Sequence, residues 1–199
     1  MNAVRDHPLS RAEILRAAIT LADSEGLAAV TMRRLGDALE VEAMALYRHV
    51  ANKQDILDGM ATMLMAEITP PSVGLGKSWQ QILREISWAY RRVIVDHPAV
   101  FTAQAGRPIV LDENQAAFKH VMATLRQAGF PRDVALDLYQ IGSSFARGFA
   151  LSDIAYAAAS HSLPDDCDSD RAFGRGLEAI ISGFEQFIGD VGPGCDRAG

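Results

Sequence analysis

Apolar residues recur along most of the chain at helical spacing, and no long stretch alternates apolar and polar positions as a half-buried strand would. Between Ser10 and Gly26 the apolar positions repeat at i, i+3, i+4 and i+7, at Ile14, Ala17, Ala18 and Leu21. Ser10 and Glu13 have the spacing of a capping box, which bonds free N–H groups at a helix start. Since β-branched residues do not cluster, the pattern predicts an all-α fold.

Three more helices are predicted before residue 69. A short helix starts at Thr31, a third runs over 43–50, and a fourth runs over 53–68. Two prolines at 70–71 must end the fourth helix, because proline removes a backbone donor and clashes with the preceding turn. These helices define a first domain at 10–69.

The rest of the chain is also predicted to be helical. The helices are expected at 78–95, 99–105, 112–128, 132–158 and 170–188. We interpret 70–77 as a boundary between domains, and 160–169 as an exposed acidic loop. The second domain is then 78–188, and the Gly-rich tail 189–199 is expected to be disordered.

Composition narrows the class of protein. The chain has 199 residues, of which 49% are hydrophobic and 22% charged, so it can form a substantial core and is not wholly disordered. No segment approaches the roughly 18–20 uncharged apolar residues of a membrane span, and the first eight residues lack a secretory core. Cys167 and Cys195 have no partnered spacing with histidines, which argues against a zinc site or a disulfide framework. We therefore expect a cytoplasmic protein without metal or cofactor.

The net charge of −6 is distributed unevenly. Residues 1–53 hold seven basic and seven acidic residues, whereas the remainder holds 12 basic and 18 acidic residues, which accounts for the whole excess. The first quarter is therefore neutral and the rest is acidic. Global charge neither requires nor excludes DNA binding, so the local arrangement of side chains must decide.

Two of the predicted N-terminal helices are joined by a tight turn, which is the helix-turn-helix arrangement. In this motif the second helix of the pair enters the major groove of DNA while the preceding helix braces it. The outward face of that second helix carries Ala43, Met44, Tyr47 and Arg48, with His49 near its end. Lys53 follows on the first turn of the next helix, where free N–H groups already favour an anion such as a phosphate.

The same residues resemble a known family. Three segments carry the resemblance: Thr31-Met32-Arg33-Arg34-Leu35, Val41-Glu42-Ala43-Met44-Ala45-Leu46-Tyr47-Arg48-His49-Val50 and Asn52-Lys53-Gln54-Asp55-Ile56-Leu57-Asp58. Together they look like the DNA-binding domain of TetR-type transcriptional regulators. The likeness covers roughly residues 10–65. The last predicted helix, over 173–185, is similar to the final helix of the tetracycline-repressor-like regulatory domain. The resemblance implies a helix-turn-helix DNA-binding domain joined to a C-terminal helical domain for ligand binding and dimerisation.

The resemblance also implies roles for individual residues. Thr31 would cap the second helix and approach a phosphate, and Arg33 would reach a base edge or phosphate. Ala43 and Met44 occupy the base-reading positions. The remaining implied contacts are with the DNA backbone, from Tyr47, His49 and Lys53.

Two positions depart from the family pattern. Glu40 stands where many relatives have glycine, so the turn is expected to be strained or differently closed. Ala43 stands where many relatives carry a polar reader, and it and Met44 offer only apolar contact, for example with a thymine methyl. Arg33, Arg48 and DNA shape would then carry more of the specificity.

Each DNA-contact assignment has a structural alternative. Tyr47 and His49 can instead be core residues with satisfied polar tips. Arg48 and Lys53 can be ordinary surface cations, and one of the Arg33–Arg34 pair is expected to do nothing at DNA.

For the second domain, two sets of residues are candidates. An effector pocket can be lined by Trp88, His97, Phe101, Phe118, Met122, Tyr139 and Phe145, for which core packing is the alternative. A homodimer interface of four helices is predicted from apolar stripes on the last two helices, at Ile141, Phe145, Phe149, Leu177, Ile181 and Phe184. The alternative is that these stripes pack only within their own subunit.

The favoured function is a ligand-responsive DNA-binding regulator, in most members of this family a repressor, that leaves an inverted-repeat double-stranded DNA operator when an unknown small-molecule effector binds. The first rival is a helical enzyme, but no nucleophile–base spacing, phosphate loop or metal-ligand cluster supports it. The second rival is a helical interaction module without a DNA role, which the density of motif residues over 31–58 disfavours.

Overall fold

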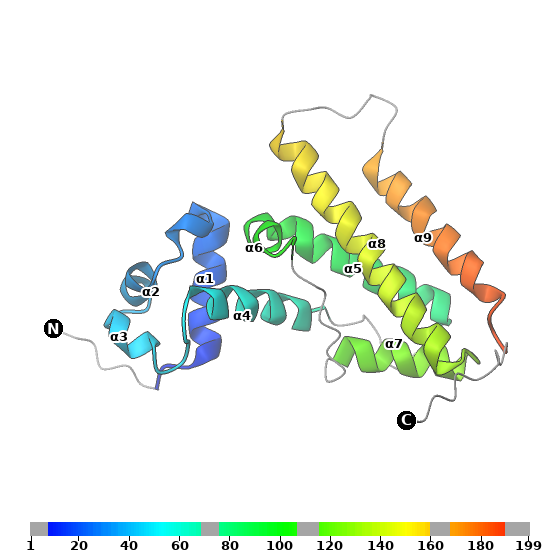
Figure 1. Ribbon diagram of the computed structural model, residues 1–199, viewed down its shortest axis with the longest axis horizontal. Helices are drawn as coiled ribbons and strands as arrows, with labels where there is room; N and C mark the ends of the chain where they lie inside the picture. The colour runs from blue at the N-terminus through cyan, green and yellow to red at the C-terminus, as the bar shows by residue number, and fades with distance from the viewer. Residues whose placement is uncertain (1–7, 69–75, 107–115, 160–167, 190–199) are drawn as a thin grey trace. The chain divides into compact units, whose positions relative to one another are not determined.

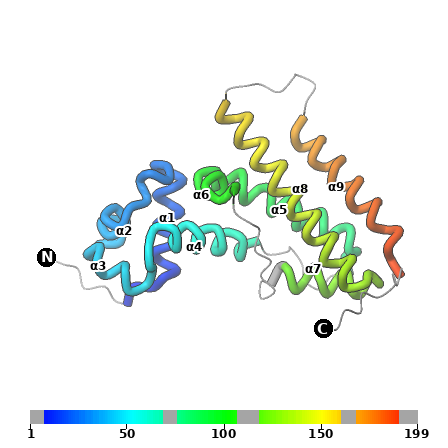
Figure 2. Tube along the Cα trace, viewed as in Figure 1, coloured from blue at the N-terminus to red at the C-terminus, as the bar shows by residue number. Residues whose placement is uncertain are grey.

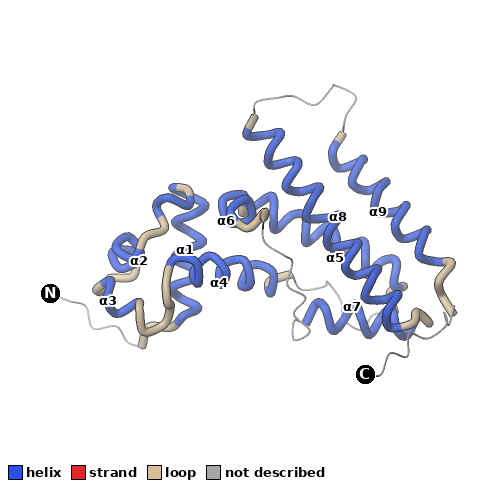
Figure 3. Tube along the Cα trace, viewed as in Figure 1, coloured by secondary structure: helices blue, strands red, loops and turns tan. Residues whose placement is uncertain are grey.

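The structure is a computed structural model that describes residues 8–68, 76–106, 116–159 and 168–189. Its elements are α1 (Arg11–Glu25), the 3-10 turn η1 (Leu27–Ala29), α2 (Met32–Ala38), α3 (Ala43–Leu46), α4 (Lys53–Ala66), α5 (Trp79–Asp96), α6 (Pro98–Ala103), α7 (Ala116–Gln127), α8 (Arg132–Ala158) and α9 (Ser169–Glu185) (Figure 1). No strand occurs within these described ranges (Figure 3). The all-α prediction is confirmed.

The predicted helix starts agree with the caps in the structure. Ser10 and Glu13 form the expected capping box, with Ser10 N donating to Glu13 Oε2 at 2.8 Å. The Thr31 hydroxyl accepts from Arg34 N at 3.2 Å, and Asn52 Oδ1 accepts from Asp55 N at 3.0 Å. Each bond satisfies an N–H group that a helix start would leave without a partner.

Helix ends agree less well with the predictions. The helix predicted over 43–50 ends at Leu46, and the chain beyond it turns with hydrogen bonds from residue i+3 to residue i, His49 N donating to Leu46 O at 2.9 Å. The last helix ends at Glu185 instead of Ile188. Outside the described residues lie the start of the helix predicted over 112–128, most of the 70–77 boundary, the 160–167 loop and the tail from 190.

The chain forms two compact units whose boundaries differ from the contiguous domains predicted. The first unit comprises 1–67 together with 96–107, and the second comprises 68–95 and 108–199. In the first unit α6 packs on α1 and α4. Gln104 Nε2, just after α6, is buried and donates to Asp58 Oδ1 on α4 at 3.0 Å. Helical periodicity predicts α6 but does not say which neighbours it packs against.

The second unit is built on an aromatic core between α5, α7, α8 and α9, with α8 and α9 lying side by side (Figure 2). A Cβ on Gly176 would lie 2.5 Å from Phe145 Cζ, so only glycine allows the Phe145 ring to approach α9 so closely. Phe145 stacks on Phe173 with ring centroids 5.2 Å apart. Phe173 is fully buried, which places it at the centre of this core.

The predicted dimer stripe largely belongs to this core. Leu177 and Ile181 are 2% and 1% exposed in a single chain, so they are not available to a second chain. Phe145, Phe149 and Phe184 are half-buried and pack against the same cluster. Of the predicted interface residues, Ile141 alone is exposed, at 45%. Leu177 and Ile181 of the predicted α9 stripe therefore pack within their own subunit, whereas the assignment of the half-buried Phe184 to a dimer interface stays a prediction.

A buried arginine joins three helices of this unit. Arg91 on α5 is 9% exposed, and its guanidinium contacts Asp153 on α8 at 2.8 Å and Asp170 on α9 at 2.6 Å. The same group lies over the rings of Trp88, Phe149 and Phe173, at 5.3, 5.7 and 5.0 Å from their centroids. Paired and stacked in this way, the buried charge ties α5, α8 and α9 together.

Candidate nucleic-acid interface

The two helices of the helix-turn-helix pair approach each other at Gly36. A Cβ at this position would lie 2.8 Å from Val41 O and 3.2 Å from Ala43 N, which are backbone atoms that cannot move aside cheaply. Val41 N also donates to Gly36 O at 2.9 Å. Gly36 therefore sets the spacing between α2 and α3, a role that the sequence analysis missed.

Glu40 lies in the turn between these helices with φ of 54°. This left-handed conformation favours glycine, and it costs a residue with a Cβ about 1–2 kcal/mol. The strain expected from Glu40 in this turn is therefore present.

The outward surface of α3 and the turn after it is partly apolar. Met44 is 72% exposed and Tyr47 is 50% exposed, and Arg48 is also exposed. Tyr47 is therefore not a core residue. Ala43 is half-buried beside the backbone of α2, so it offers less surface to a ligand than the prediction assumed.

The basic residues around this surface differ in their partners. Arg34 forms an ion pair with Glu25, whereas Arg33 is exposed and has no ion pair within the described ranges. Lys53 is exposed, and its Nζ donates to Leu27 O at 3.2 Å. An ammonium has three donors, so this bond leaves Lys53 two for a phosphate.

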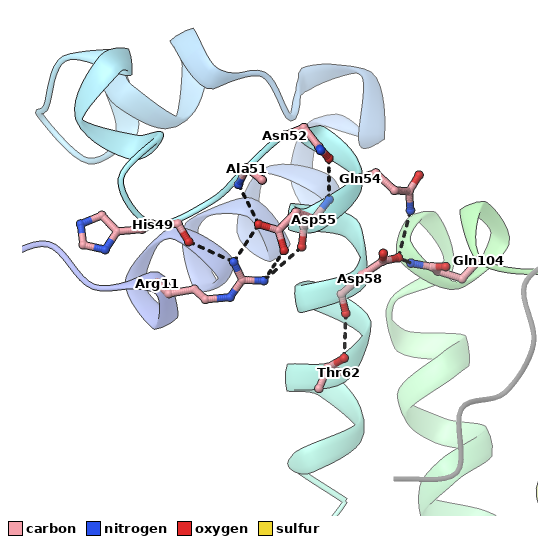
Figure 4. A network of polar contacts seen from close by, with 9 residues as sticks. All are labelled: Arg11, His49, Ala51, Asn52, Gln54, Asp55, Asp58, Thr62 and Gln104. Carbon is pink, nitrogen blue, oxygen red and sulfur yellow. Dashed lines mark hydrogen bonds and ion pairs between the residues drawn. The ribbon is translucent and has the colours of Figure 1, made fainter.

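A charged clasp fixes the loop that follows α3 (Figure 4). Arg11 on α1 donates from both terminal nitrogens to the Asp55 carboxylate on α4, at 2.9 and 2.7 Å. Arg11 Nη1 also donates to His49 O at 3.0 Å, and Asp55 Oδ2 accepts from Ala51 N at 2.8 Å. Both ends of the loop 49–51 are thus bonded to the same ion pair. The His49 ring points away from the clasp in Figure 4, so its backbone and its side chain have separate roles.

The clasp changes the acidity of Asp55. The bonds from Arg11 and then from Ala51 N lower the pKa of the Asp55 carboxyl to about 2, and Asp55 in turn raises the pKa of Arg11. The carboxylate is charged at any pH above about 4, so the loop is held throughout the physiological range.

The predicted effector-pocket residues fall into two groups. His97 and Phe101 belong to the first unit, where His97 Nδ1 lies 2.9 Å from Asp23 Oδ2 instead of capping α6 with its ring. Trp88, Met122, Tyr139 and Phe145 pack against the core of the second unit. Phe118 lies edge-on to Tyr139 at 4.9 Å, and with Met122 it lines an open hollow of about 290 Å³. The seven predicted pocket residues are thus divided between the two units, and their grouping in one pocket stays a prediction.

One candidate residue of the second unit was missed by sequence reasoning. His120 Nε2 on α7 is buried and has no hydrogen-bond partner within the described ranges. Leaving such a nitrogen unpaired costs about 1–3 kcal/mol. Nothing in the sequence distinguishes His120 from other helical histidines, because the missing partner is a property of the packing.

No group of three or more His, Cys, Asp or Glu side chains in the described ranges is placed to hold a metal ion. None of the helices there has both the length and the apolar character that a membrane span requires.

A short helix pair with a close turn, an outward reading face and flanking cations defines a helix-turn-helix DNA-binding protein. Residues 14–60 match the family of bacterial regulatory proteins, tetR family, and 71–166 match the tetracyclin repressor-like C-terminal domain. The chain belongs to the tetR family of transcriptional regulators. The second match ends before α9, so the helix on which sequence analysis based that likeness lies outside it.

Relatives and solved structures agree with this assignment. An HTH-type transcriptional regulator of Saccharopolyspora erythraea is 30% identical over 91% of this chain and 86% of its own length. The tetracycline repressor protein class D of Escherichia coli is 30% identical over 89% of each chain. The crystal structure of apo ActR from Streptomyces coelicolor has a TM-score of 0.78 and 26% identity, and the alignment covers 94% of this chain and 99% of that one.

Removal of the Asp55 charge should weaken the clasp. Asp55→Asn should lower the free energy of unfolding by about 1–2 kcal/mol at pH 7, because it weakens bonds from both Arg11 and Ala51. Asp55 has a folded pKa of about 2 and an unfolded pKa near 3.9. Its contribution is complete above about pH 5 and is lost as the pH falls through about 2. Urea unfolding should show that the difference in the free energy of unfolding between wild type and Asp55→Asn shrinks as the pH falls over that range.

The exposed Asp37 on α2 supplies a control, since Asp37→Asn should change the free energy by less than about 0.5 kcal/mol. A difference between wild type and Asp55→Asn that stays constant from pH 5 to pH 2.5 would contradict the account.

Proposed function

We propose that the protein acts as a homodimeric repressor that binds an inverted-repeat operator through α3 and leaves it when a small molecule binds the second unit. The observation that carries the proposal is the exposed face of Met44, Tyr47 and Arg48 on α3 and the turn after it, followed directly by the loop that the Arg11–Asp55 clasp bonds in place. A reading helix must be exposed yet rigid to discriminate between base pairs.

The DNA contacts follow from the exposure of each side chain. Arg33 and Arg48 are cations that can reach base edges or phosphates, and Lys53 clamps a phosphate at the start of α4. Thr31 and His49 approach the DNA backbone at the two ends of the helix-turn-helix pair. Between them, the phenol of Tyr47 also contacts the DNA backbone. Ala43 and Met44 meet the bases.

The effector is proposed to bind within the second unit. The tetracycline repressor relatives carry the name of a small molecule, and ActR was solved in complex with actinorhodin. His120 Nε2 supports a site on α7, because an effector that bonds this nitrogen recovers the cost of its missing partner. Binding there lowers DNA affinity if the effector favours a conformation in which the two reading helices no longer fit the operator.

The dimer is proposed to form through the outer faces of α8 and α9. On α8 the exposed positions Ile141, Ser144, Gly148 and Ala155 form a stripe opposite the buried one. Ala179 and Gly183 are exposed on α9. Small residues allow helices of two subunits to approach closely, and four such helices form a bundle about a two-fold axis.

Operator binding is tested by measuring how salt changes the DNA affinity of the Lys53→Ala variant. The DNA used is the sequence that flanks the coding region of this protein. The variant should bind operator and scrambled duplex more weakly by similar factors, because a phosphate contact carries no sequence information. Loss of one contact per subunit should reduce the slope of log K against log salt by about 1.8. The proposal is wrong if the protein binds the scrambled duplex as tightly as the flanking DNA and as tightly as any duplex selected from random sequence.

The effector site is tested at His120. An effector found by thermal-shift screening should bind His120→Phe roughly fivefold more weakly, because one hydrogen bond of about 1 kcal/mol is lost. His120→Gln keeps a polar group and should retain most of the affinity. Equal binding to wild type and His120→Phe would remove His120 from the site.

The dimer interface is tested at Gly148. A side chain there meets nothing within 4 Å in one chain, so Gly148→Glu should leave the subunit folded while placing a charge in the seam. Sedimentation should show monomers with weak operator binding. The matched control is Gly106→Glu, another exposed glycine with nothing within 4 Å, which should stay dimeric. A dimeric Gly148→Glu protein would place the interface elsewhere.

A further inference from the structure

The first three residues of α3 carry no side-chain hydrogen-bonding group. They are Ala43, Met44 and Ala45, and only Met44 projects, with 72% of its surface exposed. It has the largest exposed fraction of any large hydrophobic residue in the described ranges. At the end of a reading helix that meets base edges, this protein therefore presents a flexible thioether and no donor or strong acceptor.

Such a side chain can distinguish pyrimidines in only one way. In the major groove thymine presents O4 and a C5-methyl group, whereas cytosine presents an N4 amine and a bare C5. A polar reader separates the two through O4 and N4. An apolar side chain gains from burying the methyl group and is nearly indifferent to the polar atoms, provided that these keep their water.

We propose that Met44 reads the C5-methyl group of one pyrimidine in each half-site, so that 5-methylcytosine can replace thymine there. The inference rests on the proposed function and extends it: operator binding would respond to cytosine C5-methylation. Unmethylated cytosine and deoxyuridine both lack the methyl group and would bind more weakly at the same position.

The neighbouring side chains leave this reading to Met44. Ala43 is half-buried beside the backbone of α2, so it reaches less far. Tyr47 and Arg48 follow three and four residues later, one helical turn from Met44, and their polar tips address adjacent base pairs or phosphates. The clasp at 49–51 holds the end of this segment, which keeps the side chain of Met44 over one position.

The expected size of the effect follows from the methyl group. Burial of one such group contributes about 0.8 kcal/mol, which is roughly fourfold in affinity per half-site. For a dimer on a symmetric operator, two substitutions should combine to roughly fifteenfold if the half-sites act independently.

The test uses full-length protein and an operator that it selects from random duplexes. At each pyrimidine of the half-site, symmetric duplexes carrying thymine, deoxyuridine, cytosine or 5-methylcytosine are titrated. At one position thymine and 5-methylcytosine should bind within twofold of each other, and deoxyuridine and cytosine roughly fifteenfold more weakly. Met44→Ala should remove this difference, whereas Met44→Leu, which keeps an apolar side chain of similar reach, should retain it.

Two results would overturn the inference while leaving the proposed function intact. One is a selected operator at which no position depends on the C5-methyl group. The other is methyl dependence that persists in Met44→Ala. Because Met44 is mostly exposed, neither variant should unfold, and equal melting temperatures verify this. Failure to select any duplex would instead refute DNA binding itself.

Discussion

The ion pair between Arg11 and Asp55 is the contact on which the reading face depends. It connects α1 to α4, and it also bonds the carbonyl of His49 and the amide of Ala51. A four-residue helix such as α3 cannot hold itself in water, because too few hydrogen bonds offset the cost of ordering it. Its position must come from its surroundings, and the clasp fixes the chain just beyond its end.

The other end of α3 is positioned by close approach. Gly36 brings α2 against the turn, and Glu40 takes a left-handed conformation so that the chain can enter α3. With both ends fixed, the side chains of Met44, Tyr47 and Arg48 can face outward without a core of their own. The rigid support and the exposed face together make an interface that can be specific.

The second unit uses a different principle. Its helices pack through stacked aromatic rings around Phe173, and Arg91 adds charge pairs to Asp153 and Asp170. The packing of this core buries Leu177 and Ile181 on α9, and we propose that a second subunit uses the opposite, small-residue face. Among the buried side-chain nitrogen and oxygen atoms of the described ranges, His120 Nε2 is the single one without a hydrogen-bond partner, which marks where the packing is incomplete.

Periodicity and capping signals predicted most of this fold. The caps at Ser10, Thr31 and Asn52 and the full extent of α8 follow from local chemistry, which a sequence displays directly. Pairing across the chain does not follow, since Arg11 and Asp55 are 44 residues apart and nothing local links them. The membership of α6 in the first unit and the burial of Leu177 depend equally on tertiary packing.

The proposed binding mode places α3 in the major groove of each half-site. Affinity cleavage tests it most directly: Met44→Cys, with Cys167 and Cys195 replaced by serine, would carry an iron chelate that cuts nearby DNA. The account predicts two cleavage centres, symmetric about the middle of the operator and one helical turn, ~34–36 Å, or a small multiple apart. Cleavage at a single centre, or no localised cleavage on bound operator, would contradict it.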